Sequence, residues 1–245
     1  MGGGATSAPG RWGALVGARA CFFETVTVLA VFNVARTIGI VGPPLLSVIV
    51  LTAVLVLIAW HTGASRADLG LELADAGSGV RFGLAAFGVV LLVLVVGAVL
   101  PGTDGYVHDT RAQIGGGRLA YELLVVITLL TAIPEEFAFR GVLLGSATRL
   151  WGPWRATLIT SLLFGLWHIG PTLHTTSDNA LTSGASRTLG GQVALVVGSV
   201  AVTFIAGLGF SWLRLGSRSL IAPVLAHVAT NGLALTVAWV ATHSL

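Results

Sequence analysis

Long apolar stretches follow one another along almost the whole chain, and this feature limits the folds that are open to it. A helix of about 20 apolar residues spans the hydrocarbon core of a bilayer. Seven such stretches can be placed along the sequence, at about 19–40, 43–61, 81–101, 119–145, 155–171, 190–213 and 219–242. The sequence therefore predicts an all-α fold, a polytopic transmembrane helix bundle.

The composition excludes several other classes of protein. Of the 245 residues, 55% are hydrophobic and 9% are charged, whereas an ordinary soluble domain has about 25% charged residues. A mean hydropathy of +0.91 is more than one soluble core accommodates, so many of these side chains must face lipid. The single cysteine, Cys21, excludes a disulfide scaffold. Basic residues are scattered singly, which argues against a nucleic-acid partner.

The arginines predict how the chain is oriented in the membrane. All thirteen basic residues are arginine, which fits a GC-rich bacterial genome. Eight fall on the side of the N-terminus and four on the other side, with Arg140 inside a span: Arg11, Arg19, Arg66, Arg81, Arg149, Arg155, Arg214 and Arg218 against Arg36, Arg111, Arg118 and Arg187. By the positive-inside rule, the N-terminus is expected in the cytoplasm of a bacterial cell, and the chain in its cytoplasmic membrane. We expect a disordered cytoplasmic tail over 1–18 and a single membrane domain over 19–245.

Ionisable side chains inside a spanning helix are costly and mark a site or a pathway by default. The fourth stretch contains two adjacent glutamates, Glu135 and Glu136, after Pro134. Residues four apart share a helix face, so Glu136 and Arg140 are expected to pair. Glu135 then points about 100° away, and its charge is left without a partner. Such a carboxylate can take up a proton, as a general base does.

Two further stretches carry polar groups on one helix face each. Phe164 and His168 lie four residues apart in the fifth stretch, and His227 and Asn231 lie four apart in the seventh. At about 1.5 Å per residue, Glu135, His168 and His227 all lie roughly 12–20 Å from the predicted cytoplasmic helix ends. They can therefore converge on one point. A carboxylate and an imidazole can activate water, and a second histidine with an amide can stabilise an oxyanion, which indicates a hydrolytic site.

These residues resemble the three motifs of the CPBP family, also called Abi or CAAX-protease-like. The motifs are Glu-Glu-x-x-x-Arg over 135–140, Phe-x-x-x-His over 164–168 and His-x-x-x-Asn over 227–231. They occur in the family's order on three separate spans, and the resemblance covers about 119–240. It implies a membrane-embedded peptidase, an intramembrane endopeptidase of the glutamic type similar to the Ras-converting CAAX protease, with the family's all-helical fold.

The resemblance also implies a role for each residue. Glu135 and His168 would activate the water, and His227 and Asn231 would form the oxyanion site. Glu136 and Arg140 would hold the geometry, and Phe164 would shape the cavity. No cofactor and no metal ligands are expected. The partners would be the lipid bilayer and a peptide or membrane-protein substrate, with a lipidated substrate as one form.

Two other functions remain open on the sequence alone. The first is a zinc-dependent membrane metalloprotease in which His168, His227 and a glutamate bind the metal, although the sequence contains no His-Glu-x-x-His. The second is a non-enzymatic membrane protein, either a proton-coupled transporter that uses Glu135 and His168 as a relay or an immunity protein that sequesters a peptide.

Overall fold

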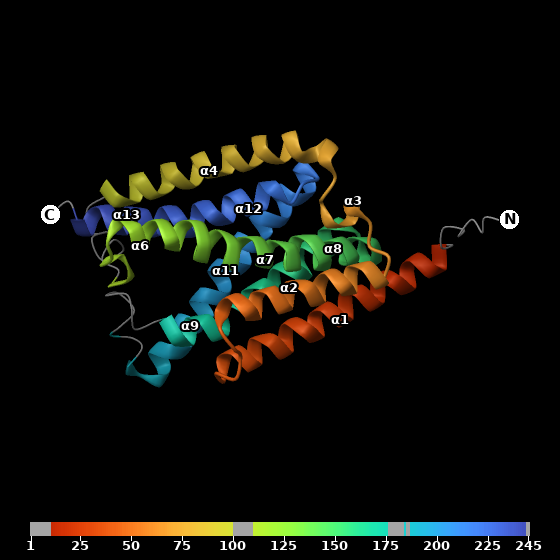
Figure 1. Ribbon diagram of the computed structural model, residues 1–245, viewed down its shortest axis with the longest axis horizontal. Helices are drawn as coiled ribbons and strands as arrows, with labels where there is room; N and C mark the ends of the chain where they lie inside the picture. Colours follow the sequence, from red (N-terminus) through yellow and green to blue (C-terminus); the bar gives the residue numbers. More distant parts are fainter. Residues whose placement is uncertain (1–10, 100–109, 176–183, 185–186, 244–245) are drawn as a thin grey trace.

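The computed structural model describes residues 11–99, 110–175, 184 and 187–243, and in these residues every regular element is a helix (Figure 1). Within this part of the chain, six helical stretches are long and apolar enough to cross a bilayer: Gly13–Thr37, Pro44–His61, Arg66–Ala98, Gly116–Leu173, Leu189–Ser217 and Ile221–His243. The prediction of an all-α transmembrane bundle is confirmed.

The longest stretch accounts for two of the seven predicted spans. It has 58 residues, far more than the roughly 20 that one span needs. Inside it Gly152 adopts φ 77° and ψ 167°, a conformation that glycine tolerates and that interrupts a helix. Pro153 follows, and it suits the first turn of the helix that resumes. The break separates residues 116–151 from residues 153–173, near the predicted fourth and fifth spans.

The elements and their bounds are as follows: α1 (Arg11–Thr37), α2 (Pro44–His61), α3 (Arg66–Leu69), η1 (Leu73–Asp75), α4 (Ala76–Val99), η2 (Thr110–Ala112), α6 (Gly116–Tyr121), η3 (Glu122–Ala132), α7 (Ile133–Glu136), η4 (Phe137–Leu143), α8 (Leu144–Trp167), α9 (Ile169–Thr175), α11 (Leu189–Ser217), α12 (Ile221–Val228), η6 (Ala229–Leu233) and α13 (Ala234–His243). Helix α11 packs on α8, α12 packs on α4, and α1 packs on α8 and α2. In Figure 1 the row formed by α6, α7 and α8 runs between the α4–α12 pair and the α1–α2 pair.

Wide helical turns surround the glutamate pair. Segments η3 and η4, on either side of α7, are π-helical, and so is η6 after α12. π-Helical turns are rare and occur often at functional sites. Pro134 lies at the start of α7, where it cannot donate the backbone hydrogen bond that a regular helix would use. The helix therefore changes type on either side of Pro134.

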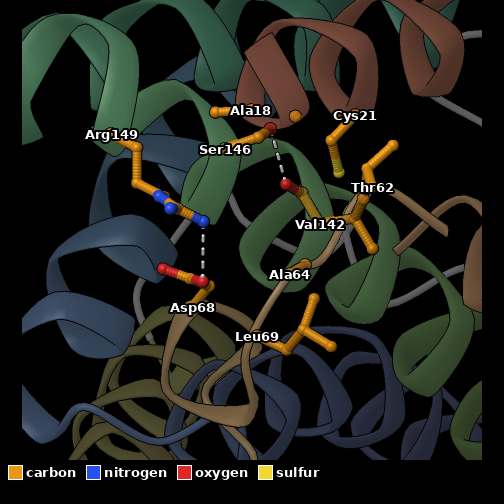
Figure 2. Close-up of a pocket in the computed structure, with 10 residues that line it drawn as sticks. Ala18, Cys21, Thr62, Ala64, Asp68, Leu69, Val142, Ser146 and Arg149 are labelled. Carbon is orange, nitrogen blue, oxygen red and sulfur yellow. Dashed lines mark hydrogen bonds and ion pairs between the residues drawn. The ribbon is translucent and has the colours of Figure 1, made fainter. Parts of the chain in front are cut away.

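The connection between α2 and α4 folds back against the helix ends. Ser65 and Asp68 cap the short helix α3 reciprocally, and Asp68 also binds Arg149 of α8 at 3.2 Å (Figure 2). The backbone carbonyl of Asp68 lies so close to Gly145 that a Cβ there would overlap with it. At Gly70 the backbone has φ 72°, and its carbonyl accepts a hydrogen bond from the Leu220 N–H at 2.9 Å. The connection is thus a built part of the bundle.

Helix α1 begins earlier than the sequence indicated. Its first residue is Arg11, so residues 11–18 belong to a helix, whereas the predicted tail extended through residue 18. Within residues 1–18, Pro9 and four of the six glycines precede Arg11, and Gly13 and Gly17 lie inside the helix. Isolated glycines are tolerated in a helix at a cost of about 1 kcal/mol each. Residues 1–10 lie outside the described part of the chain.

Candidate active site

The second glutamate is completely buried and forms an ion pair within its own helix. Glu136 is 0% exposed and Arg140 is 1% exposed, and Arg140 Nη1 donates to Glu136 Oε1 at 3.1 Å. The predicted pairing of these residues is confirmed. Aromatic rings surround the guanidinium, whose Cζ lies 4.0 Å from the Phe164 ring centroid and 5.1 Å from that of Phe210. Cation–π attraction partly replaces the lost hydration of this charge.

His227 of α12 joins the same carboxylate oxygen. Its Nδ1 lies 2.8 Å from Glu136 Oε1, the atom that also accepts from Arg140. The imidazole stacks on the Phe210 ring, with the ring centroids 5.3 Å apart and the planes 20° apart. A hydrogen bond at one ring nitrogen and a stacked neighbour fix the position of the other nitrogen, Nε2.

The first glutamate lies between an indole and this imidazole. Trp167 Nε1 donates to Glu135 Oε1 at 2.9 Å. The other oxygen, Oε2, is buried and has no hydrogen-bond partner, and it lies 3.9 Å from His227 Nε2. Because 3.9 Å is less than twice an ordinary hydrogen-bond length of about 2.8 Å, one water molecule can bond to both atoms. A buried carboxylate oxygen that lacks a donor favours such a ligand.

His168 is oriented by its own helix. Its Nδ1 lies 2.8 Å from the Phe164 carbonyl oxygen, and a carbonyl only accepts hydrogen bonds, so Nδ1 carries a proton. In the neutral ring, Nε2 is therefore left as an acceptor. His168 follows the last residue of α8 and is partly exposed. It is adjacent in sequence to Trp167, which binds Glu135.

Phe164 lies between the two histidines. Its ring centroid is 4.6 Å from that of His168 and 6.0 Å from that of His227, in edge-to-face geometry both times. The side chain is 2% exposed. Phe164 thus lies between the imidazoles and covers Arg140.

Asn231 is placed differently from the other predicted residues. It is exposed, and none of the contacts given above joins it to the buried cluster. It lies in η6 (Ala229–Leu233), which is π-helical. The common face of His227 and Asn231 stays a prediction.

The region that supplies these side chains also matches a known family. Residues 118–233 match the family described as type II CAAX prenyl endopeptidase Rce1-like. The match spans just under half of the chain. No curated protein and no solved structure matches the chain. The membrane-spanning helices make the chain an integral membrane protein, and residues 118–233 are similar to a CAAX-type protease family.

Two residues of the Rce1-like region contribute to the geometry but are absent from the sequence predictions. Trp167 holds Glu135, and Phe210 supports His227. Trp167 has a signal in the sequence, because an indole N–H inside an apolar helix needs an acceptor and Glu135 is one of few. Phe210 is one phenylalanine among ten, and its sequence context does not distinguish it.

The positions of His168 and His227 are relevant to the alternative of a zinc-dependent metalloprotease. Among the residues described, no group of three or more His, Cys, Asp or Glu side chains is placed to hold a metal ion. His227 uses Nδ1 on Glu136 and His168 uses Nδ1 on a carbonyl, so their arrangement is set by hydrogen bonds within the protein. The structure does not bring His168 and His227 together with a glutamate as a ligand set.

Proposed function

We propose that the protein is an intramembrane endopeptidase in which Glu135 activates a water molecule for attack on a peptide carbonyl. The observation that carries this proposal is the buried Oε2 of Glu135, which has no partner and lies 3.9 Å from His227 Nε2. A hydrolase needs an acceptor for the proton of water at the point of attack. Glu135 offers that acceptor, and the Trp167 N–H on its other oxygen orients it.

His168 assists Glu135 in this mechanism. Its Nε2 is an acceptor, since Nδ1 donates to the Phe164 carbonyl, and it can take a second hydrogen bond from the water or pass a proton to the leaving amine. The two proton transfers together return the site to its starting state, because the proton that leaves the water ends on the amine. The water oxygen forms the new bond to the peptide carbon, and the carbon–nitrogen bond breaks.

The oxyanion is stabilised by His227 and Asn231 in this proposal. With protons on both nitrogens, His227 carries one positive charge, and Arg140 carries another. These two charges balance the carboxylates of Glu135 and Glu136, so the buried cluster is neutral, as a low-dielectric interior favours. Nε2–H can then donate to the carbonyl oxygen as negative charge develops on it. Asn231 is exposed, and the proposal assigns its amide the second hydrogen bond to the oxyanion when a peptide is bound.

Glu136 and Arg140 act as positioning residues. Glu136 Oε1 receives both Arg140 Nη1 and His227 Nδ1, and it thereby connects the helix of the glutamate pair to α12. The substrate we propose is a peptide segment at or within the membrane. The family match makes a prenylated CAAX peptide the first probe, and an unmodified peptide of the same sequence is its matched comparison.

The experiment is cleavage of quenched fluorescent peptides by the detergent-purified protein, with wild type beside Glu135→Ala and His168→Ala, and with and without a zinc chelator. We expect cleavage that survives the chelator and is lost in both variants while their helical circular dichroism is unchanged. Loss with the chelator and recovery with added zinc would support the metalloprotease alternative. Substrate-dependent proton flux in liposomes without cleavage would support a transporter and overturn the proposal.

A further inference from the structure

A cavity lies beside Arg140, toward the connection between α2 and α4. It has a volume of about 150 Å³, and its lining includes three arginines, one carboxylate and a threonine: Arg140, Arg149, Arg214, Asp68 and Thr148. A water molecule needs about 10–15 Å³ of such space. The cavity is therefore large enough for a tetrahedral oxyanion.

The charges that line this cavity are not balanced. Asp68 is the only carboxylate on its lining, and Asp68 Oδ2 is already bound by the Ser65 N–H, the Ser65 hydroxyl and Arg149. Arg140 is already paired with Glu136, so Arg149 and Arg214 share one carboxylate whose hydrogen-bonding capacity is largely used. The lining has an excess of positive charge, and a ligand that fits it must be an anion.

Two of the guanidinium groups also have donors without partners. Arg214 is 6% exposed and Arg140 is 1% exposed. Arg214 Nη2 donates to the backbone carbonyls of Ala67 and Asp68, each at 2.9 Å, but its Nε has no partner, and neither have Nε and Nη2 of Arg140. Unlike Arg140, Arg214 forms no ion pair in the described contacts. A buried guanidinium without a counterion is costly, and an anion in the cavity removes that cost.

The position of the cavity indicates how an anion reaches it. Asp68 and Arg149 are partly exposed and lie where the α2–α4 connection meets α8, as Figure 2 shows for their ion pair. This end of the bundle carries polar connections and further arginines, among them the exposed Arg155, as expected at a membrane surface. Basic pockets between transmembrane helices bind anionic headgroups. Guanidinium groups bind phosphate through paired, charge-assisted hydrogen bonds.

We propose that this cavity binds an anionic phosphate group, which a phospholipid headgroup or free phosphate can supply. The site is independent of the peptidase proposal, because its test does not involve cleavage. Bound phosphate offers acceptor oxygens and negative charge to Arg214 and Arg149, and it stabilises the folded chain in proportion to its binding.

The experiment measures the thermal unfolding midpoint of the full chain in detergent, with native mass spectrometry for bound ligand. The probes are short-chain phosphatidylglycerol, phosphatidylcholine with the same acyl chains, and inorganic phosphate against chloride at equal ionic strength. We expect phosphatidylglycerol to bind and to raise the midpoint more than phosphatidylcholine does. A rise with inorganic phosphate alone identifies the free anion as sufficient, and a rise only with the lipid identifies the headgroup.

Variants locate the binding. Arg214→Gln is expected to weaken binding about tenfold or more, because a charged hydrogen-bond donor is lost. Arg149→Gln tests the same site through a partly exposed residue if Arg214→Gln does not fold. Arg155→Gln is the control, since it removes the same charge outside the cavity. The proposal is wrong if neither phosphate nor phosphatidylglycerol binds better than its comparison, or if Arg155→Gln weakens binding as much as Arg149→Gln.

Discussion

The substitution Glu136→Gln tests what the buried ion network contributes to the fold. Glutamine keeps the shape and one acceptor oxygen but removes the charge that faces Arg140 and His227. Arg140 is 1% exposed, so water cannot solvate the guanidinium that is left behind. Removing one partner of a buried ion pair costs about 3–5 kcal/mol, and the retained acceptor places our expectation near about 3 kcal/mol.

The assay is reversible unfolding in mixed micelles of rising denaturing-detergent content, followed by circular dichroism and tryptophan fluorescence. Glu122→Gln is the matched control, because Glu122 forms a pair of the same spacing with Arg118, whose side chain is 60% exposed. Exposed pairs contribute about 0–1 kcal/mol, so this variant is expected to stay close to wild type.

A double variant separates charge from packing. If the cost of Glu136→Gln is the uncompensated guanidinium, then Glu136→Gln with Arg140→Met is more stable than Glu136→Gln alone, because the unpaired charge is gone. A Glu136→Gln protein within about 1 kcal/mol of wild type, or a double variant less stable than the single one, would refute this reasoning.

Three further substitutions have defined outcomes. Trp167→Phe removes the N–H that holds Glu135. We expect kcat to fall about tenfold or more while the circular dichroism spectrum stays unchanged. An unchanged kcat would contradict the orienting role of Trp167. Glu135→Gln is expected to abolish cleavage while the unfolding free energy stays close to that of wild type, because His227 can release one proton and the buried cluster then stays neutral. A loss of stability would show that the carboxylate is structural. Gly145→Ala places a Cβ against the Asp68 carbonyl and should destabilise the chain by about 1–3 kcal/mol. Gly88→Ala, with open space around it, should not destabilise the chain. Thermal unfolding of the two variants side by side decides this.

Much of the bundle was predictable because the length of an apolar stretch of sequence is enough to indicate a transmembrane helix. The Glu136–Arg140 pair was predictable as well, since α-helical spacing places residues four apart on one face. The convergence of His227 on the glutamates followed from depth along the helices, and the structure places its Nδ1 2.8 Å from Glu136. Each of these inferences needed only the regular geometry of an α-helix.

The remaining details depend on departures from that geometry. Asn231 is exposed and lies in the π-helical η6, and hydrophobicity reveals neither property. Trp167 reaches Glu135 across 32 residues of sequence, a contact that depends on how two helices pack. The break at Gly152 arises from a single backbone conformation, and many of the other 32 glycines could have provided one.

The π-helical turns around the glutamate pair tie the chemistry of the site to the length of the chain. A π-helical turn holds one residue more than an α-helical turn needs, so a residue deleted within η3 can be absorbed by a return to regular α-helix, and the carboxylates keep their direction. An insertion at the same place has no surplus turn to remove, and where the helix type stays the same it rotates everything after it by about 100° about the helix axis. The carboxylates would then turn away from His227 although every residue of the three motifs was still present. In this protein, an insertion ahead of Pro134 therefore threatens the site as directly as a substitution within it.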